Sequence, residues 1–182
     1  MADAERPVSR LPALTNPDAD PILGEMFRRI LAHRPRVLNI HRTVGHAPKM
    51  LRAQASYATS MRDESPLPRD FQELIILRVA QINNSEYEQS AHRPIAKSLG
   101  VSAEKIAGLA SWRDSNLFDD RERAALAYVE QAAATGNVDD ATFGAARAEF
   151  SPQEIVELTV LAAWYTGNAR FVRALRIEPE PE

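Results

Sequence analysis

Cysteine is absent from the 182-residue sequence. Without a thiol, the chain can form neither a disulfide framework nor a thiolate metal site. A cysteine nucleophile and a peroxidatic sulfur are excluded for the same reason, because both require a thiolate. Any chemistry that the protein performs must therefore use other side chains.

An excess of positive charge is also missing. The chain carries 22 Lys and Arg against 25 Asp and Glu, a formal net charge of −3. No large positive field exists to gather the phosphates of a nucleic acid. We therefore expect no nucleic-acid partner.

Long apolar runs are lacking as well. No stretch approaches the ~18 apolar residues that a membrane-spanning helix requires. The N-terminal segment MADAERPVSRLPALTNPDADP mixes charges with prolines and has no apolar centre of the kind found in signal peptides. We expect no membrane partner and a cytoplasmic location. With 45% apolar residues, the chain fits one globular domain of ordinary size.

Helical signals fill most of the chain. Helix starts are predicted where a capping residue or a proline precedes an apolar pattern of helical period, and few windows alternate as strands do. We therefore predict an all-α fold with an extended N-terminal arm at residues 1–18, one all-α domain at residues 19–176 and an acidic tail at residues 177–182. The predicted starts lie at Asp20–Pro21, Pro48, Asp119 with Glu122, and Ser151–Pro152 with Glu154.

A weak internal repeat accompanies the helical pattern. A shift of 84 residues aligns Pro68 with Pro152 and also aligns Glu73, Leu74, Leu77 and Asn84 with identical residues. This indicates two helical half-repeats. Glu88 and His92 have no counterpart in the second copy, so we expect any chemistry to belong to the first.

Two polar residues stand out on the helices predicted for the first copy. Glu73 lies within the apolar helix PRDFQELIILRVAQI, and Ser85, Glu88 and His92 share one face of the helix that follows. A turn near Asn83–Asn84 would make these helices antiparallel and bring Glu73 opposite His92. Such a pair suits general acid–base catalysis, because imidazole titrates near neutral pH and a carboxylate raises its basicity.

The stretch ELIILRVAQINNSEYEQSAHRPIAKSLGVSAEKIAGL resembles the core motif of the carboxymuconolactone decarboxylase family, the all-α superfamily that includes alkylhydroperoxidase D. In the peroxidase branch, a Glu is followed twelve positions later by Cys-x-x-Cys-x-x-x-His. Here Glu73 and His92 match the outer positions, and Ser85 and Glu88 occupy those of the cysteines. The pattern is similar to the cysteine-free branch with the motif Tyr-Glu-x-x-x-His, which Tyr87, Glu88 and His92 match. Flanking segments extend the resemblance over most of residues 21–176.

The resemblance implies an AhpD-like helical fold and acid–base chemistry without a cofactor on a small carboxylated lactone or carbonyl compound. Glu73, His92, Tyr87 and Glu88 are the catalytic candidates that it supports. Two further residues are candidates for binding the substrate, Arg78 as a carboxylate anchor and Ser85. The resemblance also implies self-association as a homo-oligomer, either a dimer, a trimer or a hexamer.

Structural alternatives stay open for each of these residues. His92 suits a purely structural hydrogen bond, and Glu73 suits a buried ion pair with Arg78 or another arginine. The chain as a whole suits a non-catalytic oligomeric protein that has kept the fold. Trp164 and Tyr165 are more typical of a core or an interface than of a cofactor site. The spacing of His33, His41 and His46 matches no common zinc pattern, so we expect no metal.

Overall fold

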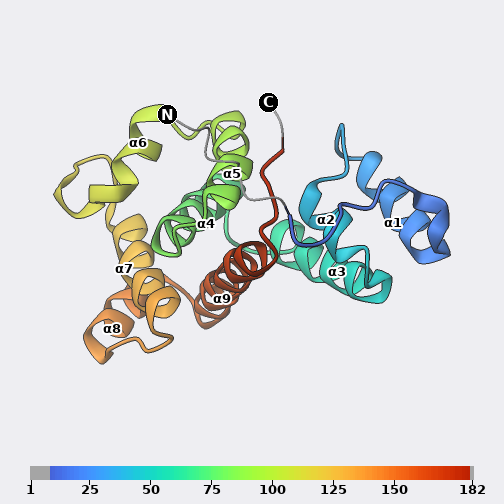
Figure 1. Ribbon diagram of the computed structural model, residues 1–182. Coiled ribbons are helices and arrows are strands. Elements are labelled where there is room, and N and C mark those ends of the chain that lie inside the picture. The colour runs from blue at the N-terminus through green and yellow to red at the C-terminus, as the bar shows by residue number, and fades with distance from the viewer. Residues whose placement is uncertain (1–8, 181–182) are drawn as a thin grey trace, which may run out of the picture. The chain divides into compact units, whose positions relative to one another are not determined.

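The computed structural model describes residues 9–180, and every regular element within this range is a helix (Figure 1). This confirms the predicted all-α class. The elements in chain order are η1 (Pro17–Ala19), α1 (Pro21–Leu31), α2 (Asn39–Val44), α3 (Pro48–Asp63), α4 (Arg69–Ile82), α5 (Glu86–Ser98), α6 (Ala103–Gly108), η2 (Leu109–Asp114), α7 (Asp120–Ala134), α8 (Asp140–Glu149) and α9 (Pro152–Leu175). Within the described range, no helix combines the length and the apolar character needed to cross a membrane.

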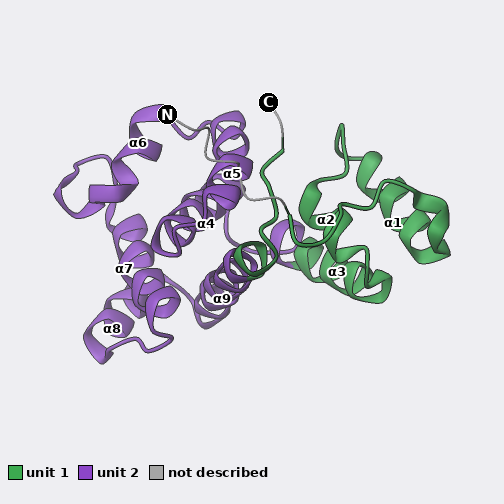
Figure 2. Ribbon diagram, viewed as in Figure 1, with its two compact units in different colours: residues 1–60, 171–182 green, residues 61–170 purple. Residues whose placement is uncertain are grey.

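The chain divides into two compact units (Figure 2). Unit 1 comprises residues 1–60 and 171–182, and unit 2 comprises residues 61–170. The boundaries of the two units differ from those predicted for the arm, the domain and the tail. The division into arm, domain and tail stays a prediction.

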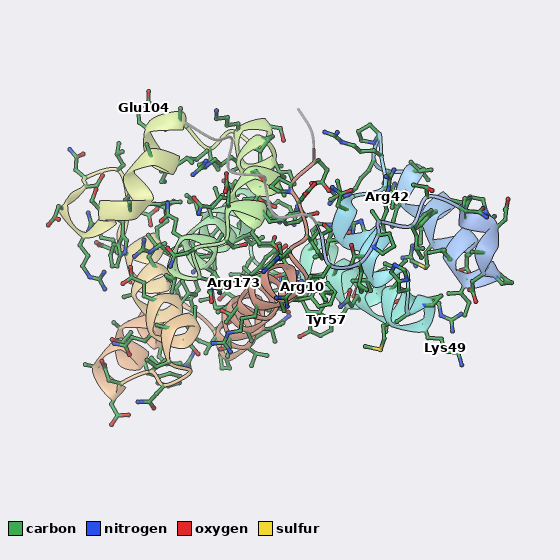
Figure 3. All side chains as sticks on the ribbon, in the orientation of Figure 1. Arg10, Arg42, Lys49, Tyr57, Glu104 and Arg173 are labelled. Carbon is green, nitrogen blue, oxygen red and sulfur yellow. The ribbon has the colours of Figure 1, made fainter. Side chains whose placement is uncertain are left out.

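Unit 1 holds its own apolar core. The helices α1, α2 and α3 and the segment between the first two contribute Leu23, Met26, Phe27, Val37, Val44 and Leu51, all less than a tenth exposed. Arg10, labelled in Figure 3, donates its backbone N–H to the carbonyl oxygen of Leu175 at 2.9 Å. In the tail, Glu178 and Glu180 accept hydrogen bonds from Asn39. The described parts of the arm and of the tail are therefore held by hydrogen bonds within this unit.

Helix α4 is the central element of unit 2. It packs against α5, α7 and η2, while α7 also packs against α8. Nearly every α4 residue from Phe71 to Ala80 is buried, with Arg78 as the exception. A helix that is apolar on all sides belongs inside a core, and this burial places Glu73 in the interior of the unit.

The predicted helix starts are confirmed. Asp20 accepts the backbone N–H groups of the first turn of α1, and Asp119 and Glu122 form a capping box at α7. At α9, the Ser151 hydroxyl accepts from the Glu154 backbone N–H, and Glu154 accepts from Ser151 in return. Each cap satisfies backbone donors that the helix itself leaves unpaired.

The turn between α4 and α5 lies where the sequence predicts it. Asn84 adopts a positive φ of 50°, a conformation that asparagine tolerates better than most residues. The Ser85 backbone N–H then bonds to the Ala80 carbonyl oxygen at 2.9 Å, which closes the turn. This reversal lays α5 alongside α4 (Figure 1).

The internal repeat is preserved in the helix starts but not at this turn. Helix α4 begins next to Pro68 and α9 begins at Pro152. Asn168, the counterpart of Asn84, lies inside α9, which continues to Leu175. The second copy therefore has one long helix where the first has two helices joined by a turn.

Candidate functional site

Glu73 is the buried carboxylate of the site. Its side chain is 1% exposed in the middle of α4. A carboxylate removed from water requires cations or hydrogen-bond donors around it. Glu73 has two such partners, Arg69 on its own helix and His92 on α5.

Helix α5 presents the remaining polar groups from its first two turns. Ser85 is the N-cap, and its hydroxyl accepts the Glu88 backbone N–H at 3.4 Å. Glu88 and His92 follow at i+3 and i+7, so they lie on one face. The helix continues through Pro94 to Ser98, so the proline does not end it.

The imidazole of His92 lies between two carboxylates. Its Nδ1–H donates to Oε2 of Glu73 at 2.7 Å, and its Nε2 lies 3.5 Å from Oε2 of Glu88. The His92 side chain is 13% exposed, and the carboxylates are almost fully buried. The predicted Glu73–His92 pairing is thus present, and Glu88 joins it.

Charge in this group favours the protonated imidazole. Burial alone would lower the pKa of His92, but the hydrogen bonds and charges of Glu73 and Glu88 outweigh it and raise this pKa from 6.5 to about 9. At neutral pH the ring therefore carries a positive charge. It is a proton donor in the resting state.

Arg69 completes the surroundings of Glu73. Its Nη2 lies 3.2 Å from Oε1 of Glu73, one helical turn away, and its Nη1 donates to Gln72. The two Glu73 oxygens thus face different cations, Arg69 and His92. A buried ion pair of Glu73 with Arg78 or another arginine is one of the alternatives that the sequence leaves open, and the structure pairs Glu73 with Arg69 at i, i+4 spacing.

Tyr165 also contacts the site, although no pattern in the sequence points to it. It comes from α9 and meets the His92 ring edge-on, with ring centroids 5.0 Å apart and an interplanar angle of 90°. We expected chemistry in the first half-repeat and assigned Tyr165 to a core or an interface. An alignment of the two halves pairs Tyr165 with Gln81, so nothing in the repeat marks it.

One oxygen of Glu88 lacks a hydrogen-bond partner. Oε1 is inaccessible to solvent and has no donor among the described residues. Buried polar atoms are nearly always paired, and each exception calls for an explanation. Glu88 therefore retains an acceptor that the protein itself does not use.

Arg78 lies outside this hydrogen-bonded group. Arg78 forms an ion pair with Glu130, which also accepts from the indole N–H of Trp112 at 2.8 Å. Tyr87 is buried on α5, one residue before Glu88. The structure thus groups Glu73, Glu88 and His92, places Ser85 as the cap beneath them, and gives Arg78 a separate ion-pair cluster.

The positions of the other histidines give no metal centre. Within residues 9–180, no group of three or more His, Cys, Asp or Glu side chains is arranged to hold a metal ion. His46 bonds through Nε2 to the Pro12 carbonyl oxygen at 2.8 Å.

Comparison with known proteins gives the family context. The model of the carboxymuconolactone decarboxylase family matches residues 48–131. The uncharacterized protein YnjA of Escherichia coli K12 is 33% identical over 174 residues, covering 94% of this chain and 91% of its own.

Solved structures share the fold. A protein of unknown function from Agrobacterium tumefaciens, described as an AhpD-type antioxidant defence protein, is 27% identical and has a TM-score of 0.70 over 77% of this chain and 97% of its own. A cysteine-to-alanine variant of the debrominase Bmp8, solved in complex with 2,3,4-tribromopyrrole, is 22% identical and has a TM-score of 0.79 over 92% of this chain and 90% of its own. The predicted AhpD-like helical fold is confirmed.

Proposed function

Because the chain belongs to the carboxymuconolactone decarboxylase family, we propose that it is a cofactor-independent acid–base catalyst of a small carboxylated lactone or carbonyl compound. One observation carries this proposal. A protonated His92 is held between two buried carboxylates, one of which has an unused oxygen. Proton donor and proton acceptor are thus adjacent, as acid–base catalysis requires.

The three residues differ in role because their surroundings differ. Glu73 is paired with both Arg69 and His92, so it orients the imidazole and sustains its charge. His92 is protonated at neutral pH and donates the proton. Glu88 has the unpartnered Oε1 and accepts a proton where the reaction releases one.

The decarboxylation step balances with these groups alone. The bond between the substrate's α-carbon and its carboxylate breaks, CO2 leaves, and the electron pair passes into an enolate. His92 then gives its proton to the α-carbon and regains one from solvent. For a substrate that isomerises instead, Glu88 removes a C–H proton and His92 protonates the adjacent position.

Thiol peroxidase chemistry is excluded for this chain. The peroxidase branch of the family uses two cysteines, and their positions hold Ser85 and Glu88 in a sequence without cysteine. A carboxylate and a hydroxyl cannot reduce a hydroperoxide as a thiolate does. The antioxidant description of the Agrobacterium relative is therefore not extended to this protein.

A second candidate function is that of a non-catalytic oligomeric protein. The observation that favours it is the pairing of Glu73, because its ion pair with His92 holds α4 to α5 and Tyr165 adds a contact from α9. A buried ion network of this kind also suits a purely structural role. Self-association and a cytoplasmic location are compatible with both candidates and remain part of the proposal.

A proton-exchange screen separates the two candidates. Small lactone carboxylates and keto acids are incubated with the protein in D2O, and NMR follows loss of the carboxylate and incorporation of deuterium. We expect turnover by the wild type and a loss of at least about 100-fold in His92→Gln, since general acid catalysis contributes about that much. His33→Gln, which alters an exposed histidine of α1's C-terminal flank, serves as the control. Turnover unchanged in His92→Gln would remove the proposed mechanism.

A further inference from the structure

We propose that Tyr165 of α9 donates a hydrogen bond to the substrate's carbonyl oxygen, which restricts the site to compounds with a carbonyl or enolate oxygen next to the reacting carbon. This inference rests on the proposed function. It assigns a substrate contact to a residue from the second half of the chain.

The position of Tyr165 is fixed by its neighbours. Its ring meets the His92 ring edge-on at 5.0 Å, and one residue further along α9 the Thr166 hydroxyl accepts from the Asn83 side chain at 3.2 Å. The contact with His92 reaches α5, and the bond to Asn83 reaches the C-terminus of α4. The tyrosine is therefore held beside the imidazole that carries the proton.

The hydroxyl of Tyr165 has no hydrogen-bond partner among the described residues. Tyr128, a buried tyrosine of the same unit, differs in this respect, because its hydroxyl bonds to Oγ1 of Thr159 at 2.6 Å. A tyrosine in a packed region normally pairs its hydroxyl. Tyr165 is only partly buried, so a ligand can supply the missing partner.

The charges around Tyr165 keep its hydroxyl protonated. Burial and then the carboxylates of Glu88 and Glu73 raise the pKa of Tyr165 above its ordinary value of 10, although Arg69 and Arg62 oppose this. The group therefore remains an O–H donor throughout the physiological range. It lies among the side chains that hold and accept the proton.

A carbonyl oxygen is the acceptor that this donor suits. When CO2 leaves, or when a C–H proton is removed, negative charge develops on the carbonyl oxygen next to the reacting carbon. A fixed O–H donor stabilises that charge more strongly than it stabilises the neutral carbonyl, and it keeps its own proton. Because Tyr165 binds the oxygen, His92 can give its proton to the carbon.

Binding of an enolate mimic tests the inference without a known substrate. 4-Nitrophenolate is a planar oxyanion whose absorbance responds to hydrogen bonding at its oxygen. We expect the wild type to bind it with a spectral shift, and Tyr165→Phe to weaken binding about 10-fold or more, since a hydrogen bond to a charged group contributes about 1.5–3 kcal/mol. Tyr128→Phe is the matched control and retains wild-type affinity.

Thermal unfolding separates a binding effect from a folding effect. Tyr165→Phe keeps the ring and its packing on His92, so we expect its melting temperature to match that of the wild type. Equal affinity of the wild type and Tyr165→Phe, or no binding by the folded wild type, overturns the inference.

The outcomes also distinguish this inference from the proposed function. Probe binding that depends on the Tyr165 hydroxyl, without turnover of any compound in the screen, leaves the inference standing and counts against the proposed function. Turnover that depends on His92, with both turnover and probe binding unaffected by Tyr165→Phe, supports the proposed function and overturns the inference about Tyr165.

Discussion

Oε2 of Glu73 lies 2.7 Å from Nδ1 of His92, although the two residues are nineteen positions apart in the chain. The contact exists because α4 and α5 run side by side across the turn at Asn84. It joins a carboxylate that is 1% exposed to an imidazole that reaches the surface. The pair thus connects the interior of unit 2 with solvent, and the charge of His92 depends on it.

Substitution of Glu73 by Gln should lower the pKa of His92. The variant removes the carboxylate that accepts the shorter of the two His92 contacts, while burial continues to disfavour the charged ring. We expect the pKa to fall from about 9 by at least about one pKa unit. An NMR titration of the histidine ring carbons measures it.

Glu104→Gln is the control for this titration. Glu104 is exposed in the first turn of α6 (Figure 3), so its loss should leave the His92 titration unchanged. A pKa near 9 in Glu73→Gln would show that this carboxylate does not hold the charge.

Stability should decrease as the pH rises from about 6.5 to about 9. The pKa of His92 is higher in the folded protein than in the unfolded chain, so the folded state binds the proton more tightly. The resulting stabilisation is fully present below pH 6.5 and is lost as the pH rises through 9. With about 1.4 kcal/mol for each pKa unit, it amounts to at most about 3–4 kcal/mol.

Urea unfolding at a series of pH values measures this effect. In His92→Gln, the free energy of unfolding should change much less between pH 6.5 and 9 than in the wild type. Parallel curves for the two proteins would contradict a raised pKa of His92.

Arg78→Met should lower stability without affecting the site. The side chains of Arg78 and Glu130 are only 16% and 15% exposed, and the substitution leaves Glu130 short of a donor. We expect a loss of about 2–3 kcal/mol in the free energy of unfolding and an unchanged pKa of His92. Arg93→Met, at an exposed arginine of α5, should change stability by less than about 0.5 kcal/mol. Loss of turnover in a fully folded Arg78→Met protein would restore Arg78 as a substrate anchor.

Glycine and alanine at position 84 should give proteins of different stability. Alanine is disfavoured at the φ of 50° found there, whereas glycine adopts it freely. Asn84→Ala should therefore be about 1 kcal/mol less stable than Asn84→Gly. Chemical denaturation of the two variants compares them directly, and equal stabilities would mean that the turn relaxes to a negative φ.

Local signals in the sequence were sufficient to predict the helices and the central pair. Asp119 and Glu122 form the expected capping box, and the turn near Asn84 brings Glu73 to His92. Both features depend on short segments with a fixed helical period, so spacing alone places them.

Long-range contacts account for what the sequence could not predict. Tyr165 reaches His92 from a helix far along the chain, and Arg78 meets Glu130 across α4 and α7. Neither contact has a local pattern, since each depends on how helices pack side by side. Arg69 is different, because its i, i+4 spacing from Glu73 is visible in the sequence.

The cap of α5 has a consequence for how easily this fold changes its chemistry. Ser85 and Glu88 lie one helical turn apart at the N-terminus of the helix, at the two positions that hold sulfur in the peroxidase branch. A helix N-terminus lowers the pKa of a thiol, so cysteines introduced there would gain reactivity from the backbone itself. Two substitutions, with Glu73 and His92 unchanged, separate the proposed proton-transfer site from a dithiol site, so few sequence changes lie between the two branches.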